Sequence, residues 1–150
     1  MLHVTFHAAF LSQEYATANR ALARENTLRE QAATRKFGAN EAQKLLEGQR
    51  ASDELIRAGK LPRVRWEKIV EHIDHAVRLA GADHVGLGSD FDGAFMPEGM
   101  EDATQFPRIT EGLVGVGYAD SDIAKILGGN TLRVMGEAET IAGQLQTGKV

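Results

Sequence analysis

Apolar residues recur at helical spacing in several parts of this chain, whereas extended apolar runs are few and short. The clearest stripe recurs at helical spacing and comprises Trp66, Ile69, Val70, Ile73, Val77 and Leu79 to Ala80. This spacing predicts a helix with one buried face, which should end at Gly81 because glycine readily forms a helix C-cap. A helix that leads directly into the short apolar run 84–88 is typical of a parallel α/β unit.

The stretch 14–37 predicts a different kind of helix. It is rich in Ala, Arg, Glu and Leu and has only a thin apolar stripe, so we expect a solvent-facing helix capped by Ser12 and ending near Gly38. A second helix should run from an Asn40 cap to about residue 58. It should end there because the Gly-Lys-Leu-Pro sequence at 59–62 does not continue a helix.

Only two segments predict strands. Residues 2–6 are β-prone, and residues 84–88 (His-Val-Gly-Leu-Gly) are short and apolar with two glycines. Further helices are expected at 106–116, 122–127 and about 130–145. Asp120 or Ser121 should cap the second of these helices. The predicted fold class is therefore α/β, with more helices than strands.

The composition fits one domain and excludes some functions. A chain of 150 residues that is 43% hydrophobic can form a packed core. Its net charge of -4 gives no basic face for nucleic acid, and no stretch could span a membrane. Because the start lacks the basic and apolar regions of a signal peptide, a cytoplasmic location is expected. Without cysteine, any metal ligand must be His, Asp or Glu.

The loop after the second predicted strand concentrates negative charge. Five carboxylates lie close together in sequence: Asp90, Asp92, Glu98, Glu101 and Asp102. Their mutual repulsion is costly unless a cation or hydrogen-bond donors lie among them. Active sites of α/β sheets and barrels lie where strands end, so Asp90 could bind a metal, act as a general base or hold a substrate ammonium group. Asp-x-Asp-Gly is also a common turn sequence, in which side chains bond the local backbone.

The sequence Asp-Phe-Asp-Gly at 90–93 allows a second enzymatic interpretation. It resembles the nucleophile loop of haloacid-dehalogenase-type phosphatases, in which the first Asp attacks phosphorus and the second is the acid/base. Against this, Ala94 stands where Thr or Val is usual, and residues 94–150 are too few for the Rossmann-like core of that family. A calcium loop fails because Ala94 and Phe95 stand where a third acidic ligand and an invariant glycine are required.

A longer, ordered series of motifs fits another family. The segments are Val4–Phe6 with Phe10–Ser12, His72–His75 (His-Ile-Asp-His), His84–Gly93, Pro97–Asp102 (Pro-Glu-Gly-Met-Glu-Asp) and Gly129–Val134. This series resembles the membrane dipeptidase (renal dipeptidase) family of metallopeptidases, over most of the chain except residues 14–60. The resemblance implies a (β/α)8 barrel that binds two zinc ions and hydrolyses dipeptides.

By this resemblance, residues 1–150 are one partial domain, the C-terminal part of such a barrel. Its parts would be strand 7 at 2–6, a helical insertion at about 13–60, strand 8 with a catalytic-type loop at 84–104, and C-terminal helices at 106–146. Strands 1 to 6 have no counterpart here. Nor do the zinc ligands of the family, which are an N-terminal His-x-Asp, a glutamate and two later histidines. No metal ligand is therefore assigned in this chain.

The resemblance implies roles for four residues. Asp90 matches an aspartate that lies beside the bridging hydroxide, relays its proton and contacts the substrate amine. Gly93 matches a position that lines the substrate site, and Phe10 matches an aromatic position near it. His7, beside the strand 7 segment, could face the barrel mouth and contact substrate.

The remaining histidines have simpler explanations. His72 and His75 lie three apart with Asp74 between them, a spacing that could bind zinc on one helix face. The resemblance places this helix away from the active-site mouth, where packing explains both. His84, at the start of strand 8, belongs to the stability end of a barrel.

Two strands alone would leave sheet edges and helix faces uncovered. We therefore expect the chain to associate with the missing barrel segment or with copies of itself, to bind a dipeptide only when completed, and to be inactive alone. Neither nucleic acid nor a membrane is an expected partner. Besides a dipeptidase fragment, a phosphatase-like enzyme and a non-catalytic helical interaction protein remain as alternatives.

Overall fold

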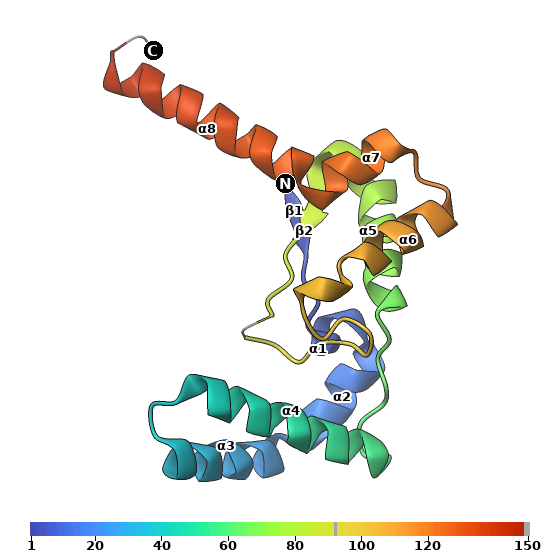
Figure 1. Ribbon diagram of the computed structural model, residues 1–150, viewed down its shortest axis with the longest axis vertical. Helices are drawn as coiled ribbons and strands as arrows, with labels where there is room; N and C mark the ends of the chain where they lie inside the picture. The colour runs from blue at the N-terminus through green and yellow to red at the C-terminus, as the bar shows by residue number, and fades with distance from the viewer. Residues whose placement is uncertain (92, 149–150) are drawn as a thin grey trace. The chain divides into compact units, whose positions relative to one another are not determined.

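The computed structural model describes residues 1–91 and 93–148, which form two compact units. The first unit comprises Met1–Val4, Ile69–Gly88 and the chain from Pro107 onward, and the second comprises Thr5–Lys68 and Ser89–Phe106. In chain order (Figure 1), the elements are β1 (Leu2–Val4), α1 (Ala8–Leu11), α2 (Gln13–Ala21), α3 (Ala23–Phe37), α4 (Glu41–Arg57), α5 (Glu67–Ala80), η1 (Ala82–His84), β2 (Val85–Leu87), η2 (Ala103–Gln105), α6 (Pro107–Val116), α7 (Asp120–Ala124), η3 (Lys125–Gly129) and α8 (Asn130–Gln146).

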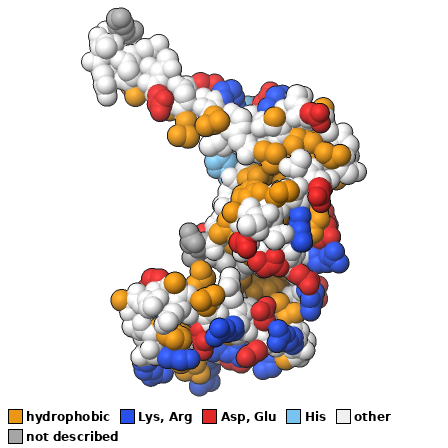
Figure 2. Space-filling model, in the orientation of Figure 1, with side chains coloured by type: hydrophobic (Ala, Val, Ile, Leu, Met, Phe, Trp, Pro, Cys, Tyr) orange, Lys and Arg blue, Asp and Glu red, His pale blue; other side chains and the backbone are white. Residues whose placement is uncertain are grey.

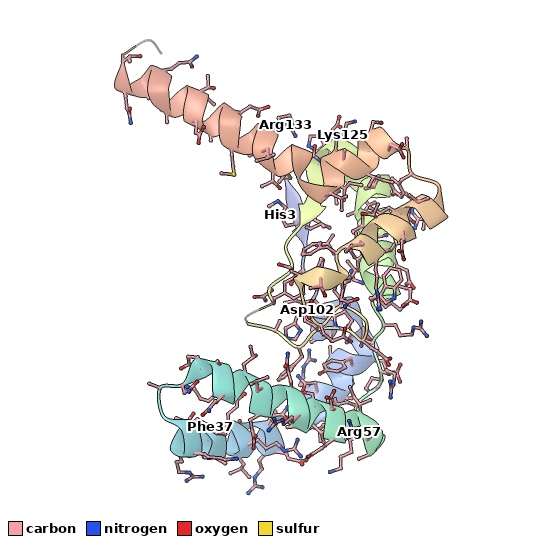
Figure 3. All side chains as sticks on the ribbon, in the orientation of Figure 1. His3, Phe37, Arg57, Asp102, Lys125 and Arg133 are labelled. Atoms are coloured by element: carbon pink, nitrogen blue, oxygen red, sulfur yellow. The ribbon has the colours of Figure 1, made fainter. Side chains whose placement is uncertain are left out.

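The first unit is built on a two-stranded parallel sheet in which β1 pairs with β2 and His3 lies opposite Gly86. The two strands approach so closely that a methyl group on Gly86 would lie 2.7 Å from Cδ2 of His3. The His3 ring reaches Thr131 at the start of α8, with 3.3 Å between Nε2 and Oγ1 (Figure 3). A methyl group on Gly88 would lie 3.1 Å from Cβ of His3. Gly86 in β2 and Gly88 directly after it therefore make room for β1.

The core of the first unit contains Ile69, Val70 and Ile73 of the apolar stripe predicted for the helix before β2. The prediction is wrong at the end of the stripe, where Leu79 is 76% exposed. Ile69 and Ile73 of α5 are fully buried, and α5 ends where Gly81 turns the chain at φ 86° and its N–H donates to the carbonyl of Val77. The other fully buried apolar side chains of this unit are Val85, Ile109, Leu113 and Ile126. Burial of side chains of this size contributes about 2 kcal/mol each, so this core is the main source of stability in the unit.

Among the described residues, Asn130 is the one buried polar side chain, with 2% of its surface exposed. It begins α8, directly after the π-helical turn η3. Its Nδ2 donates to the carbonyl of Ala82 at 2.7 Å and to that of Val85 at 2.9 Å. One amide group thus joins the start of β2 to the start of α8 and satisfies two carbonyls that the sheet does not use.

Ion pairs reinforce the same junction at its surface. Nζ of Lys125 lies 2.8 Å from Oδ1 of Asp83 and 3.0 Å from Oδ1 of Asp122. The guanidinium of Arg133 donates to the carbonyl of Asp83 at 2.8 Å (Figure 3). The hydrogen bond from Lys125 is the largest cause of the lowered pKa of Asp83. These exposed pairs fix geometry more than they add stability.

The second unit contains α1, α2, the hairpin of α3 and α4, and the loop from Ser89 to Phe106. Its buried apolar side chains include Phe6, Leu11, Tyr15, Leu55, Leu61, Val64 and Met100. The hairpin adds little to this core, because α3 buries no residue and α4 buries only Leu55. Charged side chains of both signs cover the hairpin (Figure 2), as predicted for a solvent-facing helix.

The predicted helices are observed, with one break. The chain is interrupted at Leu22, so the helix expected over 14–37 is α2 followed by α3. Ser12 and Asn40 cap α2 and α4 as predicted, accepting from the N–H of the third residue after each. The cap predicted for α7 is wrong: Ala119 occupies the cap position, and no side chain there bonds the helix start.

The strands are shorter than predicted, since the first ends at Val4 and the second covers only Val85–Leu87. His84 belongs to the turn η1. The short helix α1 was not predicted, because its four residues give no periodic signal. Many helices with few strands are compatible with part of a (β/α)8 domain, and closure into a barrel stays a prediction.

Substitution Asn130→Ala should lower the free energy of unfolding by about 2 to 3 kcal/mol, because the buried carbonyl of Val85 and the partly buried carbonyl of Ala82 lose their donor. Urea unfolding followed by circular dichroism measures this. Asn26→Ala is a matched control, since it removes the same side chain from a half-buried pair with Asn19 and should cost less than about 1 kcal/mol. Equal losses in the two variants would contradict the role assigned to Asn130.

Candidate active site

Asp90 lies in a turn three residues after β2 and is exposed. Its φ is 74°, and among the described residues it is the one non-glycine residue in the left-handed region. This conformation costs most side chains about 1 to 2 kcal/mol, although Asp tolerates it better than most. Strained backbone of this kind concentrates at functional positions. A functional role for Asp90 stays a prediction, since a local turn can also hold Asp in this conformation.

Both ends of the loop around Asp90 are held by the segment that follows β1. The N–H of Phe6 donates to the carbonyl of Ser89 at 3.1 Å, and the N–H of Ala8 donates to the carbonyl of Phe95 at 2.9 Å. The donors are two residues apart, whereas the acceptors are six apart. The chain between Ser89 and Phe95 must therefore loop outward, and Asp90 is the first residue of this loop.

An aromatic cluster holds the loop from the inside. The ring of Phe6, which is fully buried, lies 5.9 Å from that of Phe91 and 5.8 Å from that of Phe106. Phe91 and Phe106 meet edge to face at 5.7 Å. Such pairs contribute about 0.5 to 1.5 kcal/mol each beyond the burial of their area. Because Phe91 directly follows Asp90, the cluster fixes the backbone beside the carboxylate.

Local donors account for part of the acidic cluster. Glu101 accepts from the N–H of Gly99 at 2.6 Å. Asp102 accepts from the N–H and the hydroxyl of Thr104 at 2.8 and 2.5 Å, and these hydrogen bonds lower the pKa of Asp102. These carboxylates shape the loop and need no cation.

Glu98 links the acidic loop to the segment before α5. Its carboxylate pairs with Arg63 at 2.5 Å, its N–H donates to the carbonyl of Val64 at 2.8 Å, and its carbonyl accepts from the N–H of Trp66 at 3.0 Å. Asp92 lies outside the described residues. Glu98, Glu101 and Asp102 each have a hydrogen bond or ion pair that holds the loop. Among the described acidic residues of this loop, Asp90 is the one for which no such contact of the carboxylate is seen.

His7 and Phe10 lie on and beside α1. Nδ1 of His7 accepts from the N–H of Ala9 at 2.9 Å and caps α1, so Nε2 carries the proton of the neutral ring. The His7 ring lies 5.1 Å from that of Phe10, which is 69% exposed. His7 stands between Phe6 and Ala8, the two residues that hold the loop around Asp90. The second unit therefore brings this half-buried imidazole and an exposed aromatic ring to the segment that faces the loop.

Gly93 is exposed and closes the turn, since its N–H donates to the carbonyl of Asp90 at 3.2 Å. The structure thus brings Asp90 and Gly93 together, and it joins His7 to Phe10. Sequence reasoning missed Phe6, Phe91 and Phe106. Phe6 and Phe91 lie within motif segments, and Phe106 starts the helix expected at 106–116, but no local pattern shows that the three rings meet.

The histidines of α5 form no metal site in the part of the chain that the structure describes, where no three His, Asp or Glu side chains are gathered for a metal. Asp74, between them, accepts from the hydroxyl of Tyr118 at 3.1 Å and pairs with Arg78 at 2.5 Å. This part of α5 serves packing and surface contacts in the first unit. Nor does any described helix have the length and apolar character needed to cross a membrane.

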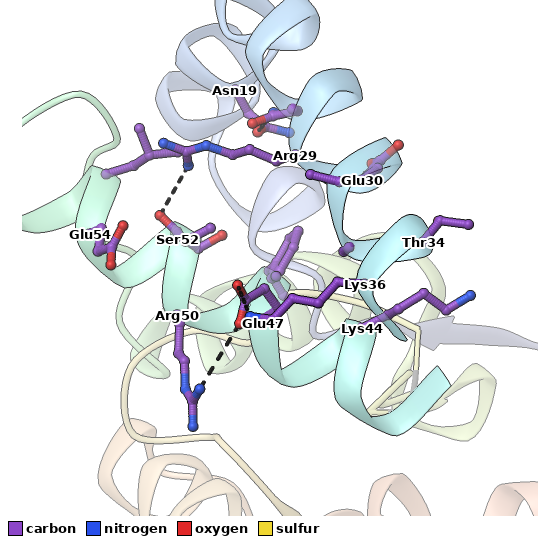
Figure 4. A pocket seen from close by; sticks show the side chains of 17 residues that line it. Asn19, Arg29, Glu30, Thr34, Lys36, Lys44, Glu47, Arg50, Ser52 and Glu54 are labelled. Carbon is purple, nitrogen blue, oxygen red and sulfur yellow. Dashed lines mark hydrogen bonds and ion pairs between the residues drawn. The ribbon is translucent and has the colours of Figure 1, made fainter. Parts of the chain in front are cut away.

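A cavity of about 900 Å³ opens beside the α3–α4 hairpin (Figure 4). Its cations already have carboxylate partners: Arg29 pairs with Glu25, Lys44 with Glu41, and both Lys36 and Arg50 with Glu47. The ring of Phe95 also lines it. A hollow whose cations are already paired with carboxylates is better explained by loose helix packing than by binding of an anionic ligand.

Asp90 follows the second strand of a parallel sheet, and active sites of α/β enzymes lie at that end of the strands. The chain belongs to the membrane dipeptidase family (peptidase family M19), which it matches over residues 1–149. This match favours the dipeptidase interpretation of residues 90–93 over the phosphatase interpretation. Hydrolase chemistry of the dipeptidase type is thus supported by family membership.

Three curated relatives are also named dipeptidases. Dipeptidase aclJ of Aspergillus oryzae is 41% identical over 78 residues, which are 51% of this chain and 18% of that protein. Dipeptidase ataJ of Aspergillus terreus is 38% identical over 90 residues, which are 59% of this chain and 22% of that protein. Dipeptidase tcpJ of Claviceps purpurea is 39% identical over 79 residues, which are 51% of this chain and 18% of that protein. The matched part of this chain spans only about a fifth of each relative.

Substitution of Asp90 tests the left-handed backbone conformation. Asp90→Gly should be more stable than Asp90→Ala by about 1 kcal/mol, because glycine adopts φ 74° without steric cost. Asp90→Asn should resemble the wild type, since Asn also tolerates this region. Midpoints of urea unfolding measure the differences. Equal stability of the Gly and Ala variants would show that Asp90 does not hold this backbone conformation in solution.

The contact between Tyr118 and Asp74 predicts a pH effect. Burial, followed by the hydrogen bond to Asp74, raises the pKa of Tyr118 to about 12. The neutral hydroxyl is favoured in the folded state, so its stabilisation is complete below about pH 10 and is lost as the pH rises toward 12. Tyr118→Phe should therefore lose less stability than the wild type between about pH 9 and pH 11, measured as urea midpoints. Parallel losses in the two proteins would contradict this.

Proposed function

We propose that this chain carries the strand 8 side of the active site of a zinc-dependent dipeptidase. The observation that supports this best is the position of Asp90 in a chain of the membrane dipeptidase family. Asp90 is exposed, follows β2, and has a backbone in the left-handed region. A dipeptide presents an ammonium group close to its scissile amide. A carboxylate held at that point can bind the ammonium group and accept a proton during hydrolysis.

His7, Phe10 and Gly93 are proposed to line the substrate site around Asp90. Because Nδ1 of His7 is used by the cap of α1, its Nε2–H is the free donor and suits a carbonyl or carboxylate of the substrate. The exposed ring of Phe10 offers apolar contact to a substrate side chain. These roles go beyond what family membership supports and rest on the placement of α1 against the Asp90 loop.

The described residues do not fit a two-zinc site by themselves. Each zinc ion needs about four ligands, and no three candidate side chains are gathered in the described part of the chain. We therefore propose that the metal ligands come from a part of the family domain beyond these 150 residues, and that this chain alone does not hydrolyse dipeptides. The small share of the relatives that it covers supports this proposal.

The proposed partner is the polypeptide that carries the remaining part of such a domain. A two-stranded parallel sheet with three residues per strand is marginal on its own, and its outer edges can accept further strands. The first unit also exposes apolar side chains at Leu2, Leu132, Ile141 and Leu145. In the absence of that partner, the same surface would favour self-association.

The proposal is tested by complementation. The chain alone, with added zinc, should hydrolyse no dipeptide; joined to the preceding part of a relative such as dipeptidase ataJ, it should do so. In the joined enzyme, Asp90→Asn should lower kcat by about 100-fold or more, since amide nitrogen cannot accept the proton. Asp102→Asn is the matched control, because Asn can still cap η2 and activity should be retained.

Two results would contradict the proposal. Zinc binding and dipeptide turnover by the chain alone would show that the ligands lie within it. A joined enzyme that folds and binds zinc but remains inactive would favour the non-catalytic interaction protein.

A further inference from the structure

We infer that Gly93 is a positioning residue for Asp90, because the absence of a side chain at residue 93 leaves the space that the Asp90 carboxylate occupies. The inference rests on the proposed role of Asp90 and extends it. By this inference, Gly93 affects catalysis because it allows the Asp90 carboxylate its position, in addition to any contact of Gly93 with substrate.

The distances identify what the glycine accommodates. A methyl group on Gly93 would lie 2.8 Å from Oδ1 of Asp90, closer than carbon and oxygen tolerate. The next nearest atoms would be Cγ of Asp90 at 3.7 Å and its Oδ2 at 4.0 Å. The three nearest atoms thus all belong to one carboxyl group.

Core packing gives no competing reason for glycine at this position, because Gly93 is exposed. The crowding that a methyl group would meet there comes from the Asp90 carboxylate.

A side chain at residue 93 would move the carboxylate rather than the loop. The backbone of the loop is held at Ser89 and Phe95 by the N–H groups of Phe6 and Ala8, and Phe91 is packed in the aromatic cluster. The Asp90 carboxyl group lies at the end of a side chain that can rotate about χ1 at small cost. Gly93→Ala should therefore change the Asp90 rotamer and leave the fold intact.

The decisive experiment uses nuclear magnetic resonance on the 150-residue chain. In Gly93→Ala, the three-bond couplings of Asp90 should report a change of its χ1 rotamer, and its Cγ resonance should shift. The thermal midpoint should stay within about 3 °C of the wild type, because the Asp90 side chain can rotate away at small cost.

Gly115→Ala is the matched control. Gly115 lies in α6, has no left-handed φ, and a methyl group there would meet no atom within 4 Å. The same chemical change at this position should leave the Asp90 couplings and the Cγ resonance unchanged.

An unchanged Asp90 rotamer in Gly93→Ala would overturn the inference. If Gly93→Ala instead lowers the thermal midpoint, Asp90→Gly in the same chain should restore it, because glycine removes the carboxylate and tolerates φ 74°. A loss that persists in this double variant would also overturn the inference, because the carboxylate would then not be the obstacle.

The joined dipeptidase adds a functional readout. There, Gly93→Ala should lower kcat/KM by about 100-fold in the wild-type background and by less than about twofold in the Asp90→Asn background. Equal losses in both backgrounds would mean that the methyl group blocks substrate directly and that positioning is not its role. If no joined enzyme is active, the proposed function fails, whereas the resonance experiment still decides this inference.

Discussion

Two backbone hydrogen bonds define the geometry of the candidate site. Phe6 and Ala8 donate to the carbonyls of Ser89 and Phe95, so a short extended segment spans both ends of a longer loop. The excess length of the loop forces a tight turn, and the turn begins at Asp90 with positive φ. The aromatic cluster of Phe6, Phe91 and Phe106 then prevents the turn from relaxing inward. The position of the carboxylate is thus a consequence of chain length between fixed points.

Most of the residues that make the family recognisable support structure. Gly86 and Gly88 make room for His3, Glu98 bridges to the segment before α5, and Asn130 joins α8 to β2. Motifs of this kind therefore identify the family more securely than they identify chemistry. Asp90 differs from them because its carboxylate has no local structural use in the described part of the loop.

The sequence predicted the helices well because their signals are local. The apolar stripe of α5 and the caps at Ser12 and Asn40 follow from spacing and side-chain chemistry within a few residues. The break at Leu22 and the helix α1 were missed, since neither has a periodic pattern or a glycine or proline to mark it. Strand ends were misjudged because pairing with a distant segment determines them.

Asp90 could be singled out from its position after a strand, but its surroundings could not. The bonds from Phe6 and Ala8 join residues more than 80 positions apart in the chain, and no local pattern reports them. The sequence left open whether a cation or hydrogen-bond donors lie among the carboxylates of Glu98, Glu101 and Asp102, because their donors cannot be identified from it. Backbone N–H groups donate to Glu101 and Asp102, and such groups are present in nearly every residue, so the sequence does not show which of them will donate.

The sparse burial of the α3–α4 hairpin has a consequence for how this protein can vary. Few of its side chains support a core, so most substitutions there change surface charge with little effect on folding. The turn at Gly38 lies at the tip of the hairpin, where inserted residues displace no buried contact. This hairpin is therefore the natural place for lineages to diverge in length and sequence, and for a fluorescent label or a fused domain to be attached.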